Sequence, residues 1–110
     1  MTSPLVVYLD DALCLEVARV GGVPGQLRAL FARLDADMDA GIDLDGDRVA
    51  APDTRQRCRF VLGELVHALA DGRQDFARSL LAYLAARWPE LRAVHVLRTE
   101  AGWDVRLEQG

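Results

Sequence analysis

The spacing of apolar residues changes along the chain, and this change constrains the possible fold more than any other feature. From residue 26 to residue 87, apolar side chains mostly recur every three or four positions, as in amphipathic helices. At both ends they alternate or form short runs rich in valine, as in strands. This order predicts an α+β fold, with three helices packed against a single-layer sheet of short antiparallel hairpins. The length of 110 residues predicts one domain, 1–110.

Three helices are predicted from this spacing and from signals at their ends. Asp53 and Gln56 match a capping box, in which each side chain accepts a hydrogen bond from the other residue's backbone. Gly72 suits the left-handed residue that often follows a helix, and Pro89 disfavours helical geometry in the residue before it. The expected helices span 26–37, 54–70 and 74–87.

Two strands are predicted at the N-terminal end. Residues 5–9 form an apolar run typical of a buried strand. Residues 13–20 fit either a second strand or a helix. We favour the strand, and therefore a hairpin, in which Leu13, Leu15 and Val17 share one face.

The C-terminal end predicts a second hairpin, because residues 93–99 and 103–108 both alternate between apolar and polar side chains. One face of the second strand carries Trp103, Val105 and Leu107. The register stays open, since a loop of two or three residues decides whether these side chains oppose Val94 and Val96 or the other face of the first strand.

An acidic segment, residues 35–47, contains six aspartates and has two interpretations. The favoured one is a hairpin over residues 42–49, because Asp45-Gly46 is a strong signal for a two-residue turn. That register places Ile42 opposite Val49 and pairs Asp43 with Arg48.

The alternative interpretation is a calcium site. The twelve residues that begin at Asp35 resemble a degenerate EF-hand loop, although Ala40 and Gly46 stand where that loop has glycine and glutamate. The candidate ligands are Asp35, Asp37, Asp39 and Asp43. Calcium is the only cofactor that the sequence suggests, and under the hairpin interpretation no cofactor is expected.

Few residues suggest catalysis. His67 lies between Glu64 and Asp71 at helical spacing, which fits a metal ligand or a solvated helix face, and we favour the face. His95 fits an ordinary sheet position, and Cys58 has no histidine partner that the sequence can identify. We therefore expect no catalytic residue and favour a protein that is not an enzyme, with an enzyme that uses an unrecognised site as the alternative.

The charge balance limits the possible partners. Arginine supplies all 13 basic residues, against 17 acidic ones, so the formal net charge is −4. An acidic chain disfavours nucleic acid as a partner. No apolar run approaches the roughly 20 residues of a membrane span, and no basic leader precedes an apolar segment. The expectation is a cytoplasmic protein that does not contact membranes.

The helix predicted over 74–87 carries the functional inference. It is apolar almost all round, so it must be covered on more than one side. A symmetric partner would provide that cover, with Leu81, Ala82 and Ala85 as the candidate interface. The sequence therefore favours a non-catalytic protein-interaction domain that self-associates, most simply as a homodimer through this helix or a sheet edge. The alternative is a calcium-binding domain that uses the aspartates of residues 35–47.

Overall fold

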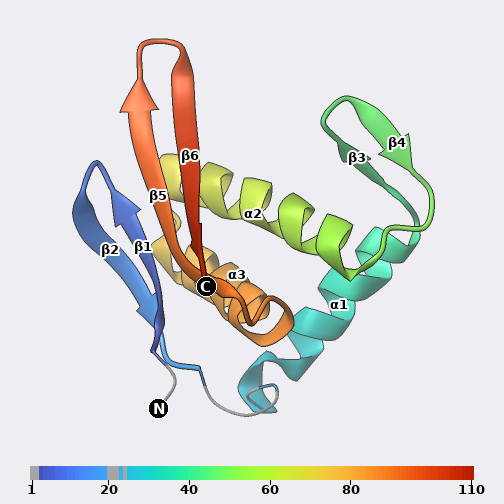
Figure 1. The fold of residues 1–110 in the computed structure, drawn as a ribbon. Coiled ribbons are helices and arrows are strands. Elements are labelled where there is room, and N and C mark those ends of the chain that lie inside the picture. Colours follow the sequence, from blue (N-terminus) through green and yellow to red (C-terminus); the bar gives the residue numbers. More distant parts are fainter. Residues whose placement is uncertain (1–2, 20–22, 24) are drawn as a thin grey trace.

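The computed structural model describes residues 3–19, 23 and 25–110 and has the α+β fold expected from the sequence (Figure 1). The elements follow one another as β1 (Leu5–Leu9), β2 (Ala12–Val17), η1 (Gly25–Leu27), α1 (Arg28–Asp39), β3 (Ile42–Leu44), β4 (Asp47–Val49), α2 (Thr54–Ala70), α3 (Gln74–Arg87), β5 (Leu91–Thr99) and β6 (Gly102–Gln109).

The main sheet has four strands in the order β2-β1-β5-β6. Both terminal hairpins are antiparallel, as predicted, but β1 and β5 pair in parallel, with Val7 opposite Val94. The sheet is therefore mixed rather than built from antiparallel pairs alone. The two strands that pair in parallel lie at its centre, where Leu5, Val7 and Val94 are fully buried on one face.

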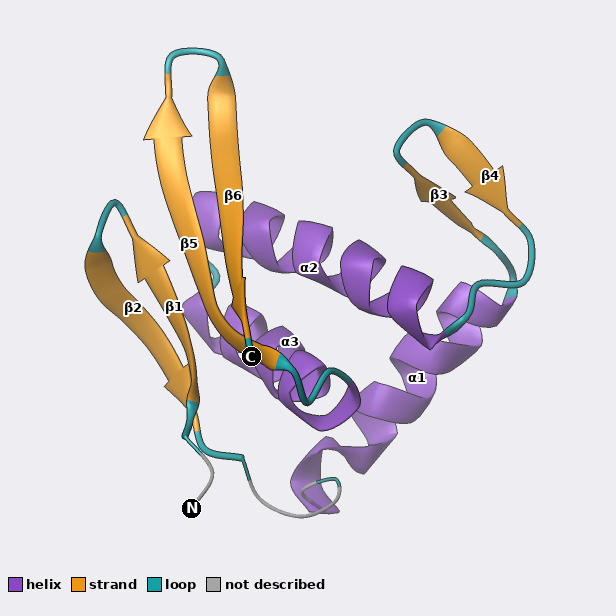
Figure 2. Cartoon of the chain, in the orientation of Figure 1, coloured by secondary structure: helices purple, strands orange, loops and turns teal. Residues whose placement is uncertain are grey.

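Helices α2 and α3 lie on one side of the sheet, and α1 crosses beside them (Figure 2). Helix α3 packs against both α2 and β2. Its residues Leu80, Leu81 and Leu84 have no exposed surface, and Ala82 is 8% exposed. Its apolar surface is thus covered by the sheet and the other helices of the same chain.

The predicted ends of α2 and α3 are confirmed, whereas α1 covers Arg28–Asp39 instead of the expected 26–37. The Asp53 carboxylate accepts a hydrogen bond of 2.8 Å from the Gln56 amide, and the Gln56 side chain accepts one of 2.9 Å from the Asp53 amide. Gly72 follows α2 with a φ of 73°. At the end of α3, Arg19 donates to the carbonyl of Ala85 at 2.9 Å, which satisfies a carbonyl that lacks a partner within the helix.

Segment 13–20 forms a strand over its first part, since β2 covers Ala12–Val17, while Val20 lies outside the described residues. The expected face is only partly correct. Leu15 lies opposite Val7 and is buried, but Leu13 lies opposite Tyr8 and is 57% exposed. An irregularity in the pairing between Val7 and Tyr8 places one extra residue in β2, and such a bulge moves the next side chain to the other face.

The structure shows the strand register of the β3–β4 hairpin and of the C-terminal hairpin. In β3–β4, Ile42 pairs with Val49 and Asp43 with Arg48, as predicted. The turn residues Asp45 and Gly46 have φ values of 52° and 84°, which is the geometry of a two-residue type I′ turn.

In the C-terminal hairpin, Thr99 lies opposite Gly102, so the loop has two residues. Val105 therefore faces Val96, and Leu107 faces Val94. This is the first of the two registers left open above. In the described parts of the chain, no helix is long and apolar enough to cross a membrane.

Candidate functional site

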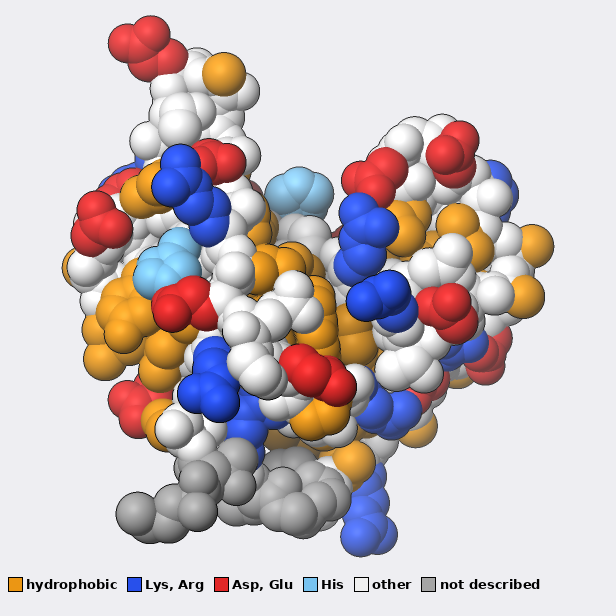
Figure 3. Space-filling view, in the orientation of Figure 1, with side chains coloured by type: hydrophobic (Ala, Val, Ile, Leu, Met, Phe, Trp, Pro, Cys, Tyr) orange, Lys and Arg blue, Asp and Glu red, His pale blue; other side chains and the backbone are white. Residues whose placement is uncertain are grey.

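An open groove of about 730 Å³ lies between strand β6, helix α2 and the β3–β4 hairpin (Figure 3). Along one side it has Trp103, Val105 and Leu107, the three residues that share one face of β6. Its floor includes Leu62 and Val66 of α2. The β3–β4 hairpin stands apart from the main sheet (Figure 1), and the groove lies between it and β6, over part of α2.

Trp103 is notable within this groove. Among the residues that the structure describes, the exposed large hydrophobic side chains are Leu13 and Trp103, and Trp103 is 37% exposed. A partly exposed tryptophan beside the apolar floor of a groove presents a large rigid surface. Such side chains are enriched where proteins contact other proteins.

The opposite side of the groove is basic. Arg59 forms an ion pair of 2.8 Å with Asp45 at the tip of the hairpin, and both residues line the groove together with Arg55. With His67 neutral, these side chains carry one net positive charge, in a chain whose net charge is −4. Figure 3 shows basic side chains on the side of the groove formed by the β3–β4 hairpin. The groove is therefore apolar at its floor and electropositive along one side.

Gly63 lies in the lining of the groove and has no side chain that could fill it. It lies in the middle of α2, where glycine costs about 1 kcal/mol relative to alanine. A Cβ atom at this position would meet no atom within 4 Å. Packing within the chain therefore does not require a glycine here. A larger residue would project into the groove, whose lining includes Gly63.

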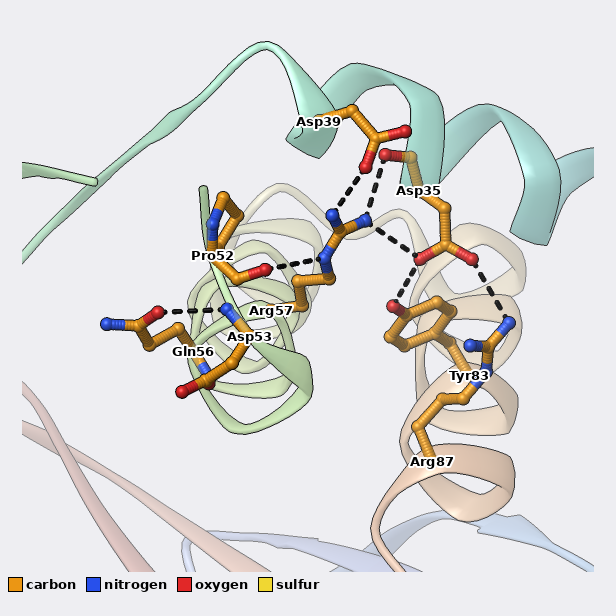
Figure 4. Close-up of polar contacts among 8 residues, drawn as sticks. All are labelled: Asp35, Asp39, Pro52, Asp53, Gln56, Arg57, Tyr83 and Arg87. Carbon is orange, nitrogen blue, oxygen red and sulfur yellow. Dashed lines mark hydrogen bonds and ion pairs between the residues drawn. The ribbon is translucent and has the colours of Figure 1, made fainter. Parts of the chain in front are cut away.

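The aspartates proposed as calcium ligands lie elsewhere, and two of them contact Arg57. Asp35 and Asp39 extend from α1 toward Arg57 of α2, with Tyr83 and Arg87 of α3 on the far side of Asp35 (Figure 4). We call these five residues the Asp35 cluster. Arg57 also donates to the backbone carbonyl of Asp35 at 3.0 Å. The cluster connects three helices through charge-assisted hydrogen bonds.

The other two candidate ligands lie outside this cluster. Asp43 pairs with Arg48 across the β3–β4 hairpin at 3.4 Å, and Asp37 is exposed on α1. Within residues 3–19, 23 and 25–110, no three histidine, cysteine or acidic side chains gather as a group that could hold a metal ion.

The candidate interface residues of α3 are largely inside the molecule. Leu81 is fully buried and Ala82 is 8% exposed, while Ala85 is half-buried. The carbonyl of Ala85 accepts the hydrogen bond from Arg19. These three residues therefore form no exposed apolar face.

The remaining reactive side chains lie in different environments. Cys58 is 2% exposed, and burial raises the pKa of its thiol to about 11, so it is protonated and weakly nucleophilic at neutral pH. His95 stacks on Tyr8, with ring centroids 4.9 Å apart, and contacts Glu108 at 2.5 Å. His67 lines the groove instead. The groove does not include Cys58 or His95, and the cavity that Cys58 lines includes neither histidine.

The sequence interpretation identified the apolar face of β6 but not the groove that it lines. Two signals pointed there: the mid-helix Gly63, and the basic residues Arg55 and Arg59, which recur at helical spacing with Leu62 and Val66. Neither signal indicates that the β3–β4 hairpin stands across from β6.

No protein-family model, curated protein sequence or solved structure matches this chain, so no relative indicates what the groove binds.

Proposed function

We propose that the protein is a non-catalytic protein-interaction domain and that the groove between β6, α2 and the β3–β4 hairpin is its docking surface. One observation carries the proposal: an apolar groove with a half-exposed tryptophan lies directly beside an edge strand of the main sheet. An edge strand has backbone groups available for pairing, and an apolar groove beside it offers burial to side chains.

The proposal keeps the interaction function inferred from the sequence and changes the surface that performs it. Self-association through α3 was expected because an apolar helix needs cover, but the chain's own sheet and helices cover Leu81 and Ala82. The groove has what α3 lacks, namely apolar side chains that are both clustered and accessible, with Trp103, Leu62 and Leu107 among them.

A selection experiment tests this function. Random ten-residue peptides displayed on phage are selected on the immobilised protein, and the affinity of each enriched peptide is measured by fluorescence anisotropy. We expect peptides whose binding is lost in Gly63→Leu. Leucine is a far better helix former than glycine and has open space at this position, so this variant stays folded while its side chain fills the groove.

Ala70→Leu is the matched control. It also places a leucine at a small, exposed position of α2, but Ala70 does not line the groove. Binding that persists in Ala70→Leu and disappears in Gly63→Leu supports the proposal. If no peptide is enriched, or if binding is equally strong in both variants, the groove is not the docking surface.

A further inference from the structure

The edge of β6 has a defined pattern of available backbone groups. Thr99 and Gly102 flank a two-residue turn, and in such turns this flanking pair is hydrogen-bonded. Hydrogen-bonded and non-bonded pairs alternate along an antiparallel ladder, so the next pair along, formed by Trp103 with Arg98, is non-bonded.

Contacts on the other side of β5 agree with this pattern. The amide of Arg98 donates to the Asp10 carboxylate at 2.9 Å, and the carbonyl of Val96 accepts from the Asp10 amide at 2.9 Å. Both groups therefore point toward β1 and away from β6. Their partners in β6, Trp103 and Val105, must direct their own amides and carbonyls toward the free edge, and Leu107 follows by the same alternation.

The same three residues direct their side chains into the groove. Trp103, Val105 and Leu107 thus combine accessible backbone groups with an apolar surface. A strand added at this edge would alternate in the same way, with every second side chain above Leu62 and Val66. This is the arrangement of β-augmentation, in which backbone hydrogen bonds give affinity and alternate pockets give specificity.

The β3–β4 hairpin lies across the groove from β6 and limits the width of a ligand that can bind there. Leu44 and Asp45 of the β3–β4 hairpin line the groove together with the residues of β6 (Figure 3). A second copy that paired its own β6 here would have to place its remaining strands across this hairpin. A single extended segment needs only the width of one strand, which is about 5 Å. The shape therefore favours a segment over a second sheet.

Charge indicates the chemistry of that segment. Arg55 lines the groove and also the adjoining cavity that contains Gln109, the last residue of β6. Arg59 and His67 add donors along the groove. These groups match carboxylates, and Arg55 places one such contact near the C-terminal end of β6.

Resting on the docking function proposed above, we infer that the groove takes one extended segment of a partner protein, which adds to β6 as a fifth strand of the main sheet. Its alternate side chains are apolar and enter the groove, and at least one carboxylate lies beside Arg55 near Gln109.

The first test uses the strongest peptide from the phage selection as its probe. Versions of that peptide are made with a single N-methyl group at each residue in turn, which removes one backbone donor and blocks close pairing. We expect a period of two: methylation of alternate residues weakens binding about tenfold or more, whereas methylation of the intervening residues changes it about twofold. Equal effects at all positions would overturn the strand addition, while binding that still requires the groove would leave the docking function intact.

The second test concerns charge. Arg55→Glu should weaken the same peptide by about tenfold, and the enriched peptides should contain aspartate or glutamate. Arg78→Glu is the control, because it makes the same charge change at an exposed position of α3 outside the groove and should alter binding less than about twofold. Enrichment of basic peptides, or equal losses in both variants, would show that carboxylates are not the ligand.

The alternative occupant, a second copy, gives a different result. Sedimentation of the wild-type protein and of Gly63→Leu would then show a dimer that dissociates in the variant. We expect the two to have the same mass, and a dimer lost in Gly63→Leu would replace the partner segment with a second copy.

Discussion

The hydroxyl of Tyr83 in α3 donates a hydrogen bond of 2.7 Å to the carboxylate of Asp35 in α1. Arg87 contacts the other oxygen of the same carboxylate at 3.1 Å, and Arg57 approaches from α2. An acidic side chain that the sequence offered as a calcium ligand therefore has three protein partners, and it holds the helices together.

We expect Asp35→Ala to lower the free energy of unfolding by about 1–3 kcal/mol, because Tyr83 is buried and would lose its acceptor. Asp37→Ala, two residues away and exposed, should change it by less than about 0.5 kcal/mol. Chemical denaturation of both variants measures the difference. Similar losses in the two variants would mean that the Asp35 cluster contributes no specific stability.

We expect the melting temperature to be the same in excess EDTA and in millimolar Ca²⁺. Asp35 and Asp39 are occupied by Arg57, and Asp43 pairs with Arg48. A bound structural ion at 100 times its Kd would add about 2.7 kcal/mol. A rise of several degrees with Ca²⁺ would therefore restore the calcium interpretation of this segment.

Local features of the fold were predictable because their causes lie within a few residues. The Asp53–Gln56 capping box and the Asp45-Gly46 turn each depend on neighbouring side chains and backbone angles, and both occur where the sequence indicated. The two-residue loop of the C-terminal hairpin was one of two options that the sequence left open, since a slip of one residue reverses the faces.

Features that depend on distant parts of the chain were not predictable in the same way. The parallel pairing of Val7 with Val94 joins residues from opposite ends of the sequence. The groove depends on two such long-range facts. Strand β6 is an edge strand, and the β3–β4 hairpin lies across from it.

The burial of α3 gives a further prediction. Ala82→Arg should destabilise the fold at every protein concentration, because an arginine at a position that is 8% exposed cannot be solvated there. Ala86→Arg, on an exposed part of the same helix, should have little effect. Circular dichroism and light scattering across a concentration range measure stability and mass together. A folded Ala82→Arg protein of half the wild-type mass would instead place this residue at an interface between copies.

Two glycines should respond in opposite directions to the same substitution. Gly46 has a φ of 84°, so Gly46→Ala forces a side chain into the left-handed region and should cost about 1 kcal/mol. Gly63 lies in a helix with open space around it, so Gly63→Ala should stabilise the protein by about 1 kcal/mol. Thermal denaturation of the pair checks both signs. Stabilisation by Gly46→Ala would contradict the type I′ turn.

Alkaline pH should lower the stability of the fold, and ionisation of the Cys58 thiol should cause the first part of this loss. Burial raises the pKa of the Cys58 thiol to about 11, and burial together with the Asp35 hydrogen bond raises the pKa of Tyr83 above its ordinary value. A raised pKa in the folded state means that the fold favours the protonated form. The stability linked to Cys58 is therefore complete below its unfolded pKa of about 8.5 and is lost as the pH rises toward 11.

Melting temperatures measured between pH 7 and pH 11 test this linkage. The wild type should lose stability progressively above about pH 8.5. A further loss should begin above about pH 10, because Tyr83 then ionises in the unfolded chain but stays protonated in the folded one. Cys58→Ala should be less stable at pH 7, because it leaves a cavity, but its melting temperature should fall less steeply between pH 8.5 and 11. Tyr83→Phe should remove only the loss above pH 10. If Cys58→Ala kept the full wild-type slope, the thiol would not be the group that couples folding to pH in this range.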